Sequence, residues 1–115
     1  MTSYVPERGH VVWLIFTPQA GHEQARRRPA VVLSPVAYNG RVGLAIVCPI
    51  TTQQKSYPFE VRIPEQLPVT GVILSDQVKS LDWRARRAEY ICTLPDATIT
   101  EVLRKVNALL VLPST

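Results

Sequence analysis

Three adjacent arginines, Arg26, Arg27 and Arg28, lie where a polar segment runs directly into an apolar, β-branched one. Guanidinium groups repel one another unless an anion lies among them, and each can give two parallel N–H bonds to phosphate or carboxylate oxygens. A rigid strand would hold the last of the three in place. We therefore expect an anion site here, with a solvated basic loop as the alternative.

A second polar segment, Pro49 to Tyr57, offers hydroxyls, amides, one lysine and one tyrosine after another apolar run. Such groups contact phosphate, read the edges of bases and stack on them. An ordinary polar hairpin loop would have a similar composition. The segment alone therefore does not decide between a nucleic-acid contact and a plain loop.

A third segment, Asp76 to Arg87, adds more basic groups. At strand period Arg84 and Arg86 would share one face, while Trp83 would point the other way and pack in the core rather than stack on a base. Three basic patches on a small sheet, with glutamine and threonine between them, suit contact with a nucleic-acid backbone.

The composition agrees with such a partner. A formal net charge of +4 and a pI of about 9.4 favour polyanions, although they do not bear on the fold. With 46% apolar and 19% charged residues among 115, we expect one globular domain over residues 1–115. The start lacks the apolar stretch of a signal peptide, and Val11–Phe16 is far below the roughly 20 residues that span a bilayer. We expect a cytoplasmic protein without membrane contact.

Several other chemistries lack their residues. The sequence contains no P-loop, G-x-G-x-x-G or G-x-S-x-G motif. His10 and His22 are isolated, although His22 could touch a substrate, and Cys48 and Cys92 have neither C-x-x-C nor zinc spacing. We expect no metal, no cofactor and two buried free thiols in a reducing compartment.

Short strands must position these segments. Apolar or alternating runs predict strands at residues 11–16, 30–33, 44–47, 59–63, 72–74 and 78–83. Pro29 suits the first position of its strand because it cannot donate to a ladder, and Pro49 is expected to close the next. Tyr38-Asn39-Gly40 is typical of a hairpin turn. This spacing favours a small antiparallel barrel or sandwich.

The last quarter of the chain changes to a helical period. The apolar residues at spacings of three and four are Ile99, Val102, Leu103, Val106, Leu109 and Leu110. Thr98 to Glu101 fits a capping box, and Pro113 is expected to end the helix. A helix over one face or end of the sheet gives an α+β fold that is mainly β.

Seven stretches spread along the chain form a recognisable set. They are Arg8-Gly9, Gly21 to Gln24, Arg28 to Ser34, Pro49 to Thr52, Tyr57 to Val61, Asp76 to Ser80 and Trp83 to Arg86. In these stretches, and in their order, the chain resembles the MazF/PemK toxin family over nearly its whole length. The resemblance implies an SH3-like antiparallel barrel (CcdB/PemK-like) with a C-terminal amphipathic helix, acting as a homodimer. It also implies ribosome-independent cleavage of single-stranded RNA, such as mRNA, at short motifs, and a MazE-like antitoxin whose acidic, flexible tail covers the RNA channel. The sequence leaves open whether mRNA, rRNA or tRNA is the main target.

The resemblance also assigns roles to residues. Arg28 matches the family's catalytic arginine, Thr51 its catalytic threonine, and Glu23 a residue that matters for toxicity. The acidic residues that close relatives carry in and after the first strand are missing from Trp13 to Pro18, so their roles do not carry over. The remaining candidates for RNA contact are Gln24, Arg26, Arg27, Thr52, Gln53, Lys55, Tyr57, Gln77, Lys79, Arg84 and Arg86.

RNA carries its own nucleophile, the 2′-OH beside the scissile phosphate. Arg28 and Thr51 would stabilise the charge that grows on the phosphorane, which is usually the largest catalytic term. The expected products end in a 2′,3′-cyclic phosphate and a 5′-OH. Arginine, with a pKa above about 12, is a poor general base. Glu23 is the carboxylate alternative, and the sequence leaves the base open.

Two other functions fit the same fold. One is a module that binds single-stranded RNA without cutting it, since the basic patches serve either role. The other is a CcdB-like toxin that poisons DNA gyrase through protein contacts near the end of the C-terminal helix. The polar and basic features of this chain lie upstream of that helix end, which favours the ribonuclease.

Overall fold

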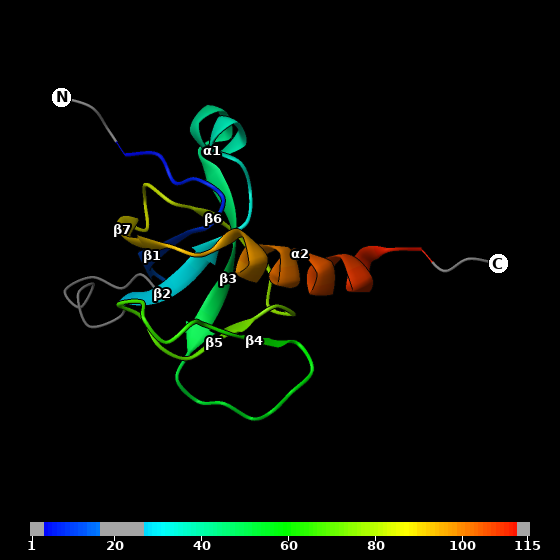
Figure 1. The fold of residues 1–115 in the computed structure, drawn as a ribbon. Coiled ribbons are helices and arrows are strands. Elements are labelled where there is room, and N and C mark those ends of the chain that lie inside the picture. Colours follow the sequence, from blue (N-terminus) through cyan, green and yellow to red (C-terminus); the bar gives the residue numbers. More distant parts are fainter. Residues whose placement is uncertain (1–3, 17–26, 113–115) are drawn as a thin grey trace.

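The computed structural model describes residues 4–16 and 27–112 of the chain (Figure 1). Within them lie seven strands and two helices. In chain order these are β1 (His10–Ile15), β2 (Arg27–Val32), α1 (Val36–Val42), β3 (Leu44–Thr51), β4 (Glu60–Arg62), β5 (Val72–Leu74), β6 (Lys79–Asp82), β7 (Glu89–Thr93) and α2 (Asp96–Leu110).

All strand pairs are antiparallel, and the strands follow the order β4-β5-β3-β2-β1-β7. Strand β3 has two partners on its other edge, because residues 44–47 pair with β6 and residues 50–51 pair with β5. The terminal strands β4 and β7 do not pair, so the sheet of the described residues is not closed into a barrel. The predicted fold class, α+β and mainly β with an antiparallel sheet and a C-terminal helix, is confirmed, and the sheet is consistent with the predicted SH3-like barrel fold although it is open between β4 and β7.

The sheet carries apolar side chains on both faces. One cluster includes Val31, Cys48 and Ile50 and is covered by Ile99 and Val102 of α2. The other includes Ala30, Val32, Ala45, Val47 and Trp83. Neighbouring residues of β2 and β3 point to opposite faces of the sheet, and both faces carry an apolar cluster. These two strands are therefore apolar almost continuously.

Two strands extend further than the sequence indicates. Strand β2 begins at Arg27, so Pro29 lies inside it, opposite Trp13 of β1. Strand β3 continues through Pro49 to Thr51. Pro49 lies where β3 has left β6 and not yet reached β5, so its missing N–H costs no bond on that edge. The predicted ends of both strands are therefore wrong.

Helix α2 starts two residues before the predicted capping box. Pro95 is the N-cap residue, and no side chain caps the helix. Thr98 is buried against the sheet within the first turn, so it cannot serve as the cap. The helix ends at Leu110, ahead of Pro113, which lies outside the described residues.

The predicted hairpin turn at Tyr38-Asn39-Gly40 is wrong, because these residues belong to α1. The Asn39 side chain is fully buried. Its Nδ2 donates to the carbonyl oxygens of Pro6 at 2.8 Å and Ser34 at 3.0 Å, and its Oδ1 accepts the Ser34 hydroxyl at 2.5 Å. The indole of Trp83 donates to the Asn39 carbonyl at 2.9 Å. Trp83 is a core residue, as predicted, being 4% exposed.

The Ser34 hydroxyl also accepts the backbone N–H of Ile46 at 2.8 Å. The Asn39 network therefore joins the N-terminal segment, the end of β2, α1, β3 and the turn after β6. In Figure 1, α1 lies at the end of β3 opposite the loop that leads to β4.

Replacing Asn39 by alanine should destabilise the fold strongly. The change leaves the Ser34 hydroxyl proton without an acceptor and two buried carbonyls without their donor, at about 1–3 kcal/mol for each unsatisfied group, so we expect a loss of about 3 kcal/mol or more. Urea unfolding followed by circular dichroism measures it. Asn107→Ala, at an exposed position of α2, is the control and should stay within about 0.5 kcal/mol. Equal stability of the two variants would show that the network is dispensable.

Candidate functional site

The β2–β3 register relates the two predicted catalytic residues. The pairing ends at Ala30 and Pro49, and continuing its register by two residues along each strand would set Arg28 level with Thr51. Residues that face one another across a pair share a face of the sheet. Arg28 is exposed and Thr51 half-buried, so both are available to a ligand on that face.

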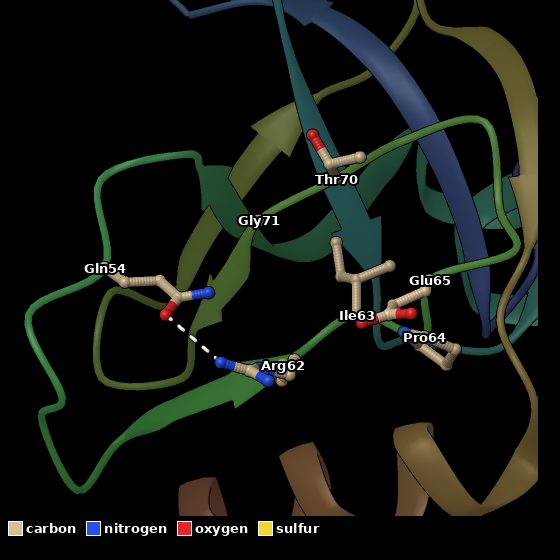
Figure 2. Close-up of a pocket in the computed structure, with 7 residues that line it drawn as sticks. All are labelled: Gln54, Arg62, Ile63, Pro64, Glu65, Thr70 and Gly71. Atoms are coloured by element: carbon tan, nitrogen blue, oxygen red, sulfur yellow. Dashed lines mark hydrogen bonds between the residues drawn. The ribbon is translucent and has the colours of Figure 1, made fainter.

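The backbone of Thr51 packs closely against a glycine of the neighbouring segment. Gly71 has a φ of +118°, and a Cβ at this position would lie 2.2 Å from the Thr51 carbonyl oxygen, so only glycine fits. The next residue, Val72, pairs with Thr51. Figure 2 shows Gly71 at the start of β5, in a shallow pocket with Arg62 and Gln54, whose side chains are 3.4 Å apart. Gly71 is a positioning residue that sequence reasoning missed.

A polar cavity of about 270 Å³ opens beside Thr51. Five of the predicted site residues line it, and they come from β3, the β3–β4 loop and the segment before β6. The full lining is Thr51, Gln53, Lys55, Tyr57, Glu60, Leu74, Asp76 and Gln77. The Thr51 Oγ1 accepts the backbone N–H of Gln53 at 3.1 Å, which leaves its own proton free to donate.

Two carboxylates in the lining, Glu60 and Asp76, were not among the predicted site residues. Glu60 accepts the backbone N–H of Lys55 at 3.0 Å and that of Tyr57 at 3.5 Å. Asp76 accepts the Tyr57 hydroxyl, and this bond raises the pKa of Tyr57 above its ordinary value, so the phenol stays protonated. The position of Asp76, directly before Gln77 in a polar stretch, was the signal that could have identified it.

Helix α2 provides a third contact that holds the β3–β4 loop. The Lys105 ammonium donates to the Pro58 carbonyl at 2.6 Å. The β3–β4 loop, which projects from the sheet in Figure 1, is therefore held by Glu60, Asp76 and Lys105 in the conformation that presents Lys55 and Tyr57. A loop fixed before a ligand arrives binds at a lower entropic cost.

Arg27 differs from its neighbour Arg28. It pairs with Ile15, on the opposite face of β2. Its guanidinium forms an ion pair with Glu89 at 2.8 Å and lies 4.6 Å from the centre of the Trp13 ring. These contacts join β2 to β1 and β7, so Arg27 stabilises the packing of the three strands. The predicted contact of Arg27 with RNA stays a prediction.

The interpretation that Arg84 and Arg86 share a strand face is wrong. Strand β6 ends at Asp82, whose carboxylate accepts the backbone N–H of Arg84 at 3.1 Å and of Ala85 at 3.0 Å and so starts a turn. Arg84 lies over Trp83, 4.7 Å from the ring centre. Arg86 donates to the carbonyl oxygens of Ile15 and Phe16 at the end of β1.

The other predicted contacts divide into two groups. Thr52 and Lys79 are exposed, and Lys79 pairs with Val47 on the sheet face that we assign to Thr51. Glu23, Gln24 and Arg26 lie outside the described residues, as does His22. His10 is a structural contact, since its Nδ1 lies 2.7 Å from the Tyr4 hydroxyl and its ring stacks on Tyr4.

Metal and membrane features can be stated for the described part of the chain. Residues 4–16 and 27–112 contain no group of three or more His, Cys, Asp or Glu side chains placed to hold a metal ion. No helix among them is both long and apolar enough to cross a membrane.

Comparison with known proteins defines the class to which this sheet and its polar face belong. The family model of the PemK-like, MazF-like toxins of type II toxin–antitoxin systems matches residues 7–110. The chain is 46% identical to the endoribonuclease toxin MazF of Escherichia coli K12 over 110 residues, covering 96% of this chain and 98% of that protein. It is 38% identical to the E. coli endoribonuclease toxin ChpB, over 89% of this chain and 91% of that one.

Solved structures agree with this class. MazF from Deinococcus radiodurans superposes with a TM-score of 0.85 at 57% identity, covering 94% of this chain and 98% of that one. A MazE–MazF structure from the same organism gives a TM-score of 0.86 at 49% identity, covering 96% and 100%. The chain therefore belongs to the PemK-like, MazF-like toxin family. The family and enzyme class predicted from the sequence are confirmed, since the relatives are named endoribonucleases.

Replacing Glu60 by alanine should loosen the β3–β4 loop. Its carboxylate forms charge-assisted bonds to two backbone N–H groups, so their loss should speed hydrogen exchange at Lys55 and Tyr57 by about tenfold or more. Exchange measured by NMR on the whole protein checks this. Glu65→Ala, at an exposed acid outside the loop, is the control. Unchanged exchange at both amides would mean that Glu60 does not hold the loop.

Proposed function

We propose that this toxin cuts single-stranded RNA, including mRNA, without a metal ion, and so arrests translation and growth. The observation that supports the proposal is the β2–β3 register, whose continuation would set Arg28 level with Thr51, beside a polar cavity that Thr51 lines. An exposed guanidinium and a free hydroxyl proton on one sheet face can hold the non-bridging oxygens of one phosphate.

The reaction needs no external nucleophile. The 2′-oxygen attacks the adjacent phosphorus, its proton passes to a base, the bond to the 5′-oxygen breaks, and that oxygen takes up a proton. Arg28 and Thr51 donate to the phosphorane oxygens as their charge grows. Glu23 is the carboxylate that the sequence offers as base. Of the predicted RNA contacts, Gln53, Lys55, Tyr57 and Gln77 line the cavity next to this phosphate.

We also propose that the toxin acts as a homodimer in the cytoplasm and is neutralised by a MazE-like antitoxin. A net charge of +4 and an exposed basic face complement an acidic, flexible tail that would compete with RNA. The similarity of this chain to the D. radiodurans MazE–MazF structure supports this choice of partner. Exposed apolar side chains on α1, such as Val36 and Val42, suit a contact between protomers.

Arg28→Ala should abolish cutting while the fold is kept. Losing one donor to the developing charge costs on the order of 10²–10³ in rate. A long single-stranded RNA is incubated with the protein in EDTA, and the fragment ends are mapped by sequencing. Arg104→Ala, at an exposed arginine of α2, should cut like the parent.

Each of the other possible outcomes would indicate a different function for this protein. Cutting by Arg28→Ala at the parental rate would remove Arg28 from the mechanism. Intact RNA with a mobility shift would indicate a binding module, and intact RNA without one would call for a gyrase assay.

A 2′-deoxy substitution at the cut position should stop cleavage there, because it removes the nucleophile. Cleavage sites elsewhere in the same RNA that keep their 2′-OH serve as the internal control and should still be cut. The fragments of the parent RNA should end in a 2′,3′-cyclic phosphate and a 5′-OH, as read by mass spectrometry. Cleavage of the deoxy substrate, or 3′-OH ends, would require an attacking water instead.

A further inference from the structure

Strand β2 has few backbone partners at the point where it carries Arg28. Its ladder with β3 ends at Ala30, so at Arg28 the described part of the sheet offers the strand only one neighbour, Leu14 of β1. The next residue, Pro29, has no N–H to give to either side. The guanidinium that the proposed reaction needs therefore projects from a strand end with fewer ladder bonds than the middle of the strand.

The side chain of Arg27 supplies further contacts to the same strand end, on the other face of the sheet. Arg27 pairs with Ile15 of β1, and its side chain runs across β1 towards β7, which lies two strands and thus roughly 10 Å away. Its guanidinium lies 4.6 Å from the centre of the Trp13 ring and 2.8 Å from the Glu89 carboxylate. One side chain thus connects three neighbouring strands, one residue away from Arg28.

The end of β1 that Arg27 contacts is itself fixed. The backbone N–H of Ile15 donates to the Arg86 carbonyl at 3.0 Å, and the Arg86 guanidinium donates to the Ile15 carbonyl at 3.0 Å. Trp13 pairs with Glu89, so both side-chain partners of Arg27 belong to one ladder, between β1 and β7. The contacts of Arg27 therefore join the start of β2 to a part of the sheet that has anchors of its own.

We propose that Arg27 is a positioning residue, which through Trp13 and Glu89 holds the start of β2 so that Arg28 keeps the orientation that the reaction needs. The inference rests on the proposed role of Arg28. A donor aimed at charge that grows in the transition state is effective only while its geometry is kept, and small displacements cost rate. Arg27 itself touches neither the RNA nor the reacting atoms.

A positioning role places the effect of Arg27 in kcat rather than in KM. The polar cavity beside Thr51 is lined from β3, β4, β5 and their adjoining loops, whereas the side chain of Arg27 contacts β1 and β7. Loss of these contacts should therefore weaken transition-state stabilisation by Arg28 and leave RNA binding nearly unchanged. A direct contact of Arg27 with phosphate would instead raise KM when it is lost and reduce the salt dependence of binding.

Glu89→Gln separates the two roles, because they predict changes of opposite sign. Removing an acid near a polyanion site should strengthen RNA binding if charge alone matters. If Arg27 positions Arg28, loss of this exposed partner should lower kcat about threefold to fivefold and keep KM within about twofold. Cleavage of a short RNA with one cut site measures both constants. Glu101→Gln removes an equal charge from an exposed position of α2 and should cleave like the parent.

Substitutions of Arg27 test the same contact from the other strand. Arg27→Gln loses the ion pair and the contact with Trp13, so kcat should fall about tenfold, whereas Arg27→Lys keeps a cation there and should stay within about threefold of the parent. The double variant Arg27→Gln/Glu89→Gln should be no slower than Arg27→Gln alone, because both changes remove one ion pair. Arg104→Gln, at an exposed arginine of α2, is the charge-matched control. Losses that multiply in the double variant would overturn the proposal.

Hydrogen exchange in the absence of RNA distinguishes this proposal from the proposed nuclease. The backbone amides of Arg28 and Leu14, which pair in the β1–β2 ladder, should exchange about threefold to fivefold faster in Glu89→Gln than in the parent, as measured by NMR. If exchange rises in this way but the parent cuts no RNA, the cleavage mechanism fails and the role of Arg27 in holding β2 stands. Unchanged exchange refutes the positioning role and leaves a nuclease that cuts RNA intact as a proposal. A lower KM with an unchanged kcat in Glu89→Gln would likewise overturn it.

Discussion

The buried side chain of Asn39 is the interaction on which the rest of the structure depends. It bonds to two carbonyls and one hydroxyl from segments far apart in the chain, and its own carbonyl receives the Trp83 indole. Buried polar networks of this kind define one arrangement, because any other leaves a donor or acceptor unpaired. Ser34, one member, also bonds to the start of β3. The network therefore fixes β2 against β3 at one end, and the register of that pair, continued to the other end, would set Arg28 level with Thr51.

A second constraint acts at the far end of β3. The β3–β4 loop has no regular hydrogen bonding of its own, yet a carboxylate of β4, a carboxylate before β6 and an ammonium of α2 hold it. Each anchor comes from an element that is itself packed against the sheet. The protein thus builds a rigid polar surface from a segment with little core, and it does so with charged groups whose partners lie in the loop backbone and in the Tyr57 hydroxyl.

Much of this arrangement could be predicted from local patterns. The apolar run Val72–Leu74 matches β5, and the helical period near the C-terminus matches α2. Short-range rules failed where tertiary contacts override them. Asn39-Gly40 has the sequence of a turn, but burial of the amide makes it part of a helix. Strand β7 was missed because Glu89 and Tyr90 are exposed, which leaves a weak apolar pattern. The gathering of Gln53, Tyr57 and Gln77 around one cavity depends on β3 changing partners, which no local pattern encodes.

Arg27 and Arg28 are neighbours on β2, so their side chains lie on opposite faces of the sheet. This limits which mutations β2 can accept. Arg27 contacts Glu89 and Trp13, and Arg28 lies on the opposite face of β2, where we propose that RNA binds. A slip of one residue in β2 exchanges the two, because neighbouring side chains point to opposite faces. Substitutions in the preceding segment leave the phase of the strand intact, whereas a single-codon insertion or deletion within β2 reverses it. We therefore expect amino-acid substitutions before β2 to be tolerated far better than insertions or deletions within β2.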